Sequence, residues 1–429
     1  MRLKQGTIRV LFALSSLFFV AGCGDTFRPI ANPLPKPAPD PSASHTAVVV
    51  FSGGPVPTGS AAAPGTSLQI NVAGDSISGQ VSLGVNPIHA LIGGVVTSVN
   101  QGDSSLTSYP EGSANFIAGV TSPPPVTTIS LPGDAAPTFA VTAAGNTYVA
   151  FSASSHHSVG IVNSSSAFVG ELPVGNNPTA LVALPNGSKV YAINQGSNNV
   201  SVINTSDQSV GGPIAVGTTP VYGVASADST RVYILNKGSG TVSIIDTSTD
   251  TVIAPPAGST FTNATVQVGT APSFAIYDPQ LNHVYVTNET SNTLSVIDAN
   301  SGAPSVNTKI AEIALQGTTP KSVTVLPNTT KIYVANFGSN TVSVINALSN
   351  QVVKTIPVGL HPISIAASPD NAKVVVANQG DQASATAGSV SMISTATDTE
   401  TMRINAPASS CPPPSTSCAP QTAVVVGVI

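Results

Sequence analysis

The sequence predicts an all-β protein, and three observations support this prediction. Gly, Pro, Ser, Thr, Asn and Val dominate the 429 residues, and these residue types favour strands and turns over helices. Short runs of apolar residues alternate with polar ones at period two, which indicates strands. The same pattern of runs then recurs along the chain at regular intervals. The chain is therefore expected to be an array of short-stranded units.

Charged residues are scarce, at 8% of the chain, and the formal net charge is −5. Disordered chains combine low hydrophobicity with high net charge, whereas 41% of these residues are hydrophobic. The 14 Lys and Arg residues form no cluster that could neutralise phosphates. Nucleic acid is therefore not an expected partner.

Residues 1–22 are expected to be a lipoprotein signal peptide. Three basic residues precede an apolar run of 12 residues, 10–21, which is shorter than the roughly 20 residues that span a bilayer. The run ends in Val20-Ala-Gly-Cys23, which resembles the lipobox of bacterial lipoproteins, where the Cys is lipidated. The resemblance implies lipidation of Cys23, membrane lipid as a partner and, because Gly24 rather than Asp follows, an outer-membrane location. Ordinary secretion and an uncleaved anchor are the alternatives.

Residues 23–44 are expected to form a tether, and residues 45–429 the folded domain. Six prolines lie within residues 27–45, and such a segment favours extended polyproline II, which acts as a semi-rigid spacer. If Cys23 is lipidated, Cys411 and Cys418 remain, and in an exported protein a local disulfide between them is favoured. A two-Cys metal site is the alternative, but no His lies nearby in sequence.

The folded domain contains two kinds of repeated motif. The first is a strand motif that ends in Asn and is followed, after a turn rich in Gly, Ser and Asn, by an alternating apolar run such as Val342-Ser-Val-Ile. Its copies are Tyr191-Ala-Ile-Asn194, Tyr233-Ile-Leu-Asn236, Tyr285-Val-Thr-Asn288, Tyr333-Val-Ala-Asn336 and Val375-Val-Ala-Asn378. The second is a Gly-x-x-Pro step whose prolines, from Pro87 to Pro362, are 50, 41, 42, 52, 48 and 42 residues apart. A period in the forties with about four short strands is typical of propeller blades.

These motifs resemble the YVTN family of β-propeller repeats, which is named for the motif nearly intact in Tyr285-Val-Thr-Asn288. The resemblance covers roughly residues 45–429 and implies the fold more than a function. Members of the family resemble bacterial and archaeal surface proteins, and relatives include lactonase-like propellers.

The chain ends predict eight four-stranded blades. The last segment, Pro420–Ile429, resembles a first strand, and its missing continuation lies at the other end of the domain. There, Thr46–Phe51, Ser67–Asn71 and Ser78–Gly84 match the second, third and fourth strands. Pairing of the two termini would close the ring and remove free strand edges. Seven blades remain the alternative if one weak early unit is an insertion.

No catalytic motif is found, and no metal or cofactor is expected. His156 and His157 are adjacent, so on a strand they would point to opposite faces, and they are interpreted as surface or turn residues. Asp246 and Asp250 flank a turn, where a role in capping their own backbone is favoured over calcium binding. The repeated Asn is interpreted as structural, bonding its own turn and tolerating a left-handed conformation.

Variation between blades indicates a candidate binding surface. The turn after the second strand and the Gly-x-x-Pro turn are expected to share one face, around the central channel. The best candidates for a binding rim there are Lys237, Glu289, Phe337, Gln379 and His361. The alternative is that these residues are solvated loop tips without a ligand.

The tether and the missing catalytic motif favour a binding or scaffold module at the cell envelope, with an envelope protein or a glycan as partner. The alternative is a lactonase-like hydrolase at the channel mouth that uses an acid–base pair such as His361 with Glu289. A haem-covering redox propeller is a third hypothesis, although the sequence contains no Cys-x-x-Cys-His motif.

Overall fold

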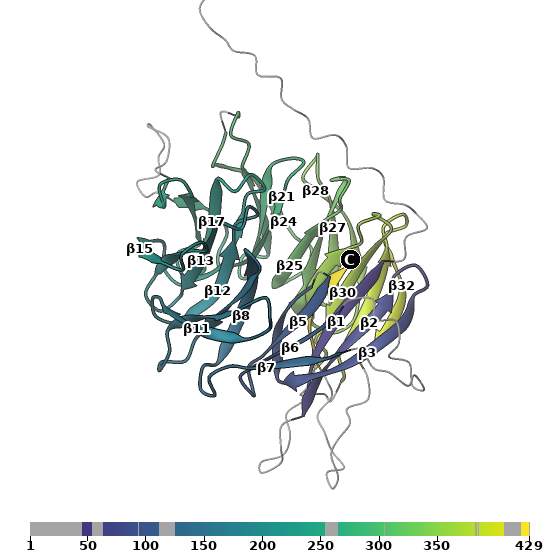
Figure 1. Cartoon of the computed structure of the whole chain (residues 1–429). Helices are drawn as coiled ribbons and strands as arrows, with labels where there is room; N and C mark the ends of the chain where they lie inside the picture. Colours follow the sequence, from purple (N-terminus) through teal and green to yellow (C-terminus); the bar gives the residue numbers. More distant parts are fainter. Residues whose placement is uncertain are drawn as a thin grey trace, which may run out of the picture. The chain divides into compact units, whose positions relative to one another are not determined.

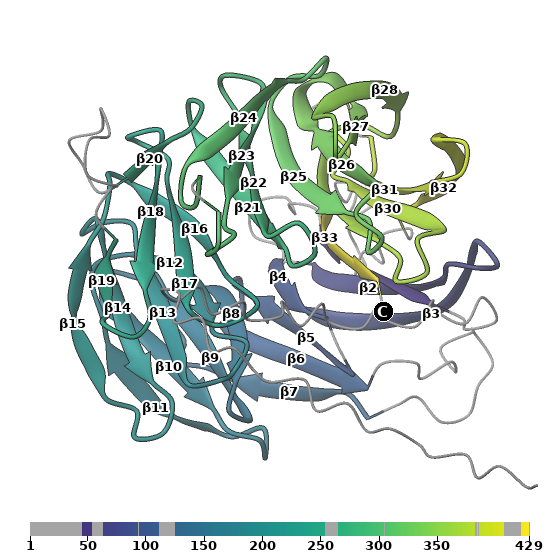
Figure 2. The same cartoon turned by 90° about the horizontal axis from the view of Figure 1, so that it is seen from above.

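The computed structural model is built almost entirely of strands, arranged as eight sheets in a ring (Figure 1, Figure 2). Within the described residues, the single helical element is a 3-10 turn, η1 (Phe337–Ser339), and no helix is long and apolar enough to cross a membrane. All described residues belong to one compact unit. The structure describes residues 45–53, 63–92, 94–110, 125–253, 265–303, 305–381, 384, 386–406 and 422–428. The predictions of a signal peptide, a tether, lipidation at Cys23 and a Cys411–Cys418 disulfide fall outside these ranges.

Each sheet is a blade with an inner, a second, a third and an outer strand, and the sets below run from blade 1 to blade 8. The inner strands are β33 (Thr422–Val428), β4 (Pro87–Leu91), β8 (Pro137–Ala143), β12 (Pro178–Ala183), β16 (Pro220–Ala225), β21 (Pro272–Asp278), β25 (Pro320–Val325) and β29 (Pro362–Ala367). The second strands are β1 (Thr46–Ser52), β5 (Val95–Asn100), β9 (Asn146–Phe151), β13 (Lys189–Asn194), β17 (Arg231–Asn236), β22 (His283–Asn288), β26 (Lys331–Asn336) and β30 (Lys373–Asn378). The third strands are β2 (Pro64–Asn71), β6 (Ser105–Pro110), β10 (Ser158–Val162), β14 (Asn199–Asn204), β18 (Thr241–Asp246), β23 (Thr293–Asp298), β27 (Thr341–Asn346) and β31 (Ser389–Ser394). The outer strands are β3 (Ser76–Val85), β7 (Thr127–Ser130), β11 (Phe168–Pro173), β15 (Val210–Ala215), the pair β19 (Thr251–Val252) and β20 (Thr265–Gln267), β24 (Lys309–Ala314), β28 (Gln351–Pro357) and β32 (Thr399–Asn405).

The two ends of the chain close the ring in blade 1, as predicted. β33 pairs antiparallel with β1, with Val426 opposite Val49, so the sheet order is β3-β2-β1-β33. In Figure 1 the purple strand β1 and the yellow C-terminal strand lie side by side. The predicted count of eight blades is therefore confirmed, as are the assignments of β1, β2 and β3 to the second, third and fourth positions.

The hydrophobic core lies between neighbouring blades and follows the period of two. Val49 of β1 packs in the cluster that contains Val375 of blade 8. Its neighbour Val48 faces the other way, into the cluster that contains Val96 of blade 2. Because successive residues of a second strand point to opposite faces, the middle of each blade is buried on both faces.

The repeated Asn fastens the second strand to the third. Asn336 Nδ2 donates to Thr341 Oγ1 at 3.2 Å and to Ser343 Oγ at 2.9 Å, both on β27. The same pair of bonds to the third strand is made by Asn100, Asn194, Asn236, Asn288 and Asn378. The predicted structural role is confirmed, but the predicted left-handed tolerance is wrong. Asn336 has φ −98°, and the left-handed residue of this turn is Asn340, with φ 57°.

The Gly of each Gly-x-x-Pro step is required because it packs directly on that Asn. A Cβ atom added at Gly317 would lie 2.3 Å from Cγ of Asn336, far inside normal contact. Equivalent close approaches to the Asn are found at Gly84, Gly175, Gly217, Gly269 and Gly359. In blade 3 the Asn is replaced by Phe151, and Gly160 on the third strand provides the space for its ring.

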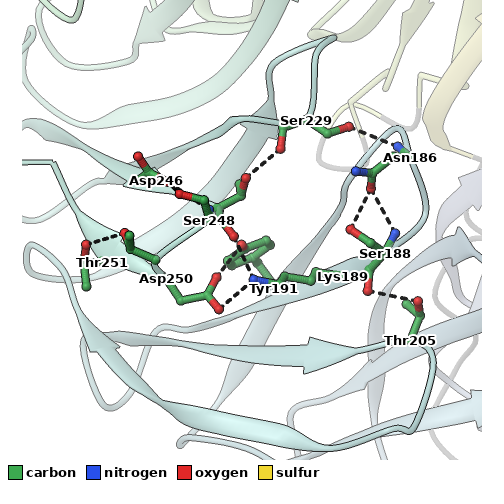
Figure 3. A network of polar contacts seen from close by, with 12 residues as sticks. Asn186, Ser188, Lys189, Tyr191, Thr205, Ser229, Asp246, Ser248, Asp250 and Thr251 are labelled. Atoms are coloured by element: carbon green, nitrogen blue, oxygen red, sulfur yellow. Dashed lines mark hydrogen bonds and ion pairs between the residues drawn. The ribbon is translucent and has the colours of Figure 1, made fainter.

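Polar side chains also join one blade to the next, on the hairpins between third and outer strands (Figure 3). Lys189 Nζ of blade 4 lies 2.7 Å from Asp250 Oδ2 of blade 5, and Tyr191 OH donates to Asp250 Oδ1 at 2.8 Å. Lys331 and Tyr333 of blade 7 bind Asp398 of blade 8 in the same way. Lys373 of blade 8 pairs with Asp75 at 2.7 Å, so an ion pair also bridges the closure at blade 1.

The two aspartates weighed for calcium binding have different roles. Asp246 caps its own turn, as predicted, by accepting hydrogen bonds from the backbone N–H and the hydroxyl of Ser248. The prediction was wrong for Asp250, whose carboxylate accepts from the preceding blade instead. Sequence spacing alone could not reveal this partner, because Lys189 lies 61 residues away.

Candidate functional site

Two sets of turns share one face of the ring, as predicted. In six blades the backbone N–H of the residue after the second strand donates to the carbonyl of the residue before the inner-strand Pro. These pairs are Gln101 to Asn86, Gln195 to Asn177, Lys237 to Thr219, Glu289 to Ala271, Phe337 to Thr319 and Gln379 to His361. The face therefore has a repeated, hydrogen-bonded backbone frame that differs between blades mainly in its side chains.

Three charged side chains from three neighbouring blades meet on this face. Glu289 of blade 6 is held between Lys237 of blade 5, at 2.8 Å, and Lys321 of blade 7, at 2.7 Å. Burial acts to raise the pKa of Glu289, but the two ammonium groups outweigh it and hold the pKa below its ordinary value of 4.5. The carboxylate is thus ionised at neutral pH, and the group of three carries one net positive charge.

An aromatic pair continues this array into blade 8. The rings of Phe337 and His361 are stacked, with centroids 4.5 Å apart and planes 14° apart. Lys321 Nζ lies 5.7 Å from the centroid of Phe337, within the range of a cation–π contact. Lys321 is therefore shared between the charged group and the aromatic pair. We call Lys237, Glu289, Lys321, Phe337 and His361 the rim cluster.

His361 is held in place by three hydrogen bonds. Its backbone N–H donates to Asn340 Oδ1 at 2.8 Å, and its carbonyl accepts from Gln379 N–H at 2.9 Å. Its Nδ1 lies 2.8 Å from the carbonyl of Gly380, which only accepts, so Nδ1 carries the proton. The backbone at His361 is left-handed, with φ 55°, as it is for the residue before Pro in the other described loops of this kind. The ring is therefore positioned before any ligand arrives.

The structure brings the predicted rim residues together and adds one. Four of them form the rim cluster, and Gln379 adjoins it through its bond to His361. Phe337 is half-buried and stacked on His361, so it is not a solvated loop tip. Lys321 was not predicted from the sequence. It could have been noticed, because only one Gly-x-x-Pro repeat has a Lys directly after its Pro. The suggested acid–base pair is not assembled, because Glu289 bonds the two lysines and His361 bonds Gly380.

A second polar cluster lies in blade 3. His156 is a turn residue, as predicted, and its ring joins two carboxylates. Nε2 lies 2.8 Å from Asp134 and Nδ1 lies 2.9 Å from Glu171. Among the residues that the structure describes, no group of His, Cys, Asp and Glu is arranged to hold a metal ion.

We expect His156 to make stability depend on pH. The hydrogen bond to Asp134, followed by that to Glu171, raises the pKa of His156 above 6.5, and the same bond lowers the pKa of Asp134. A histidine whose pKa is raised by folding stabilises the folded protein fully at pH values below its unfolded pKa of 6.5. This stabilisation is lost as the pH rises through the higher pKa of the folded protein. The free energy of unfolding in urea should therefore fall as the pH rises above 6.5, and this fall should be smaller in His156→Gln but not in His157→Gln. Equal pH slopes in all three proteins would contradict this assignment.

Comparisons with known proteins indicate the fold. The model of the Choice-of-anchor I domain matches residues 273–410, which is less than half of the chain. No curated protein matches the sequence.

Among solved structures, the chain is similar to AztD from Citrobacter koseri, with TM-score 0.60, 12% identity, and coverage of 90% of this chain and 98% of that one. It is also similar to a candidate 6-phosphogluconolactonase from Bacteroides fragilis, with TM-score 0.52, 14% identity, and coverage of 76% and 98%. Virginiamycin B lyase from Staphylococcus aureus matches with TM-score 0.51, 14% identity, and coverage of 68% and 90%. These neighbours share the propeller fold and differ in their named functions.

Proposed function

We propose that the protein is a membrane-tethered, extracytoplasmic binding module whose ligand is bound at the rim cluster. The observation that supports this most directly is the continuous array of side chains from four consecutive blades, Lys237 to His361, on a hydrogen-bonded frame of turns. The lipobox-like segment ending in Cys23 supports the tether. The partial match to a Choice-of-anchor domain is in keeping with such a protein.

The chemistry of the rim cluster favours a polar partner such as a protein loop or a glycan. Two ammonium groups and a carboxylate offer donors and acceptors side by side, and the stacked Phe337 and His361 offer a flat apolar surface. Nε2 of His361 is free of the bond to Gly380 and adds one more polar atom. Because charges of both signs are present, a polymer of uniform charge is a poorer fit.

The experiment that tests this proposal is cross-linking to native envelopes. Alanine at both Phe337 and His361 should leave folding intact, since changes at partly exposed positions away from the core cost about 0.5 kcal/mol or less. Recovery of the cross-linked partner, measured by mass spectrometry, should fall strongly relative to the wild type. Leu348→Ala is the control, because Leu348 is 78% exposed in the turn between β27 and β28 and is outside the rim cluster. Equal recovery from the double variant and the wild type would place the binding surface elsewhere.

Hydrolysis of lactones at the channel mouth is the competing function. Such hydrolysis needs a base and an acid within reach of one substrate. In this structure, however, Glu289 bonds to two lysines and His361 bonds to Gly380. Lactone hydrolysis by the purified protein that disappears in His361→Ala would overturn the binding-module proposal.

We expect Cys23→Ala to abolish membrane attachment. One acyl chain alone binds a bilayer only marginally, so a lipoprotein depends on the several chains attached at its Cys. Fractionation should find the variant in soluble fractions, or as an uncleaved precursor on a denaturing gel. A variant that is processed and retained in the membrane like the wild type would rule out the lipid anchor.

A further inference from the structure

A band of four aromatic rings follows the inner strands of the ring. His89 on β4, Phe139 on β8, Tyr222 on β16 and Phe274 on β21 each stand two residues after the Pro that begins the strand. His89 and Phe139 are stacked with centroids 3.9 Å apart, and Tyr222 and Phe274 are stacked at 4.8 Å. Phe139 and Tyr222 meet edge to face at 6.0 Å and join the two stacks. We call these four residues the aromatic band.

The band crosses blade 4 because that blade has a small residue at the same position. Ala180 of β12 is 2% exposed, and both Phe139 and Tyr222 pack against the cluster to which it belongs. A larger side chain there would occupy the place where the two rings meet. The band therefore spans blades 2 to 6 without interruption.

The four rings are not ordinary core residues. The tyrosines of the second strands, such as Tyr191, are 0% exposed, whereas all four residues of the band are only partly buried. The inner strands that carry the band surround the middle of the ring (Figure 2). Burial lowers the pKa of His89 to about 4 and raises the pKa of Tyr222 to about 12, so both are uncharged at neutral pH.

The inner strands are almost free of charged residues. The sequences of the eight inner strands contain two charged residues, Lys321 directly after its Pro and Asp278 at the opposite end of β21. Within the described residues, no side chain or backbone group is hydrogen-bonded to the Tyr222 hydroxyl, and that atom is not sealed from solvent. Sites for mainly apolar ligands typically combine an apolar or aromatic surface with a few polar atoms that orient the ligand, and the Tyr222 hydroxyl is such an atom.

We propose that the aromatic band is a second binding site, distinct from the rim cluster, for an uncharged planar ring compound. The ligand would pack against the accessible parts of the Tyr222–Phe274 and His89–Phe139 pairs. The Tyr222 hydroxyl would bond to a polar atom at its edge. A charged ligand would lose its hydration among side chains that offer no counter-charge.

The test uses N-phenyl-1-naphthylamine, an uncharged aromatic fluorophore that brightens in apolar surroundings. Tyr222→Leu and Phe274→Leu keep apolar bulk but remove a ring, and each should weaken binding of the fluorophore about tenfold. Leu348→Ser and Met402→Ser are the controls, since they remove exposed apolar side chains outside the band, and they should bind as the wild type does. Unchanged affinity in both ring variants, or an equal loss in the controls, would overturn the proposal.

A second measurement does not depend on the stability of the ring variants. The wild-type protein contains eight tyrosines and is labelled with 3-fluorotyrosine, and the Tyr222 signal is assigned by the conservative change Tyr222→Phe. Saturating fluorophore should shift the Tyr222 fluorine resonance and leave the buried tyrosines of the second strands in place. An unshifted Tyr222 signal at saturation would overturn the proposal, whereas the rim cluster variants leave this result unaffected.

Discussion

Deletion of residues 422–429 is expected to lower the melting temperature by more than about 10 °C or to cause aggregation. Without β33, blade 1 loses its inner strand and the edge of β1 becomes free. Residues Ala47 to Phe51 of β1 are 0% exposed in the intact ring, and the deletion would open the edge of this strand to solvent. Large losses of this kind arise when buried apolar surface and strand pairing are removed together.

A synthetic peptide of residues 421–429 provides the control for this deletion. If β33 acts by completing blade 1, the peptide added in trans should pair with β1 and restore much of the melting temperature, as in other cases of strand addition. A peptide with the same residues in scrambled order should not. A truncated protein that melts like the wild type would show that the ring does not depend on its C-terminal strand.

Gly317→Ala is expected to destabilise the protein by about 2 kcal/mol or more in urea unfolding. The added Cβ would lie 2.3 Å from Asn336, which is 0% exposed and fixed by two hydrogen bonds to β27. Either the backbone shifts or these bonds break.

Gly133→Ala is the matched control for this change. Gly133 lies in the equivalent loop before β8, and a Cβ there meets nothing within 4 Å. That variant should unfold at nearly the wild-type urea concentration. If the two variants were equally stable, the close contact between Gly and Asn would not be what fixes this repeat.

The repeats made the architecture predictable from sequence. Six of the eight blades carry the same Gly-x-x-Pro step. The segment from Thr46 resembles a blade that lacks its first strand, which indicated closure by Thr422–Val428. The shared face of the two sets of turns followed from the same repeat. In contrast, the sequence did not reveal that the Asn bonds to the third strand, because that bond depends on the pairing of Asn336 with Thr341 in the folded blade.

The side-chain clusters were less predictable because they form between blades. Glu289 lies 52 residues from Lys237 and 32 from Lys321 in sequence, and only the ring brings them within bonding distance. The aromatic band was missed because positions two residues after the Pro hold Phe, Tyr or His in some blades and Ala or Ser in others. Such variation hides a site that is assembled from several repeats.

Site-specific photo-cross-linking tests the central claim, binding at the rim cluster, most directly. A photoreactive amino acid at position 379 adjoins His361 without replacing a member of the cluster, and one at position 348 lies on an exposed turn outside it. Both proteins are expressed in the native host, irradiated and examined by mass spectrometry. The proposed function predicts a defined adduct from position 379 and none from position 348. The same adduct from both positions, or one from position 348 alone, would contradict it.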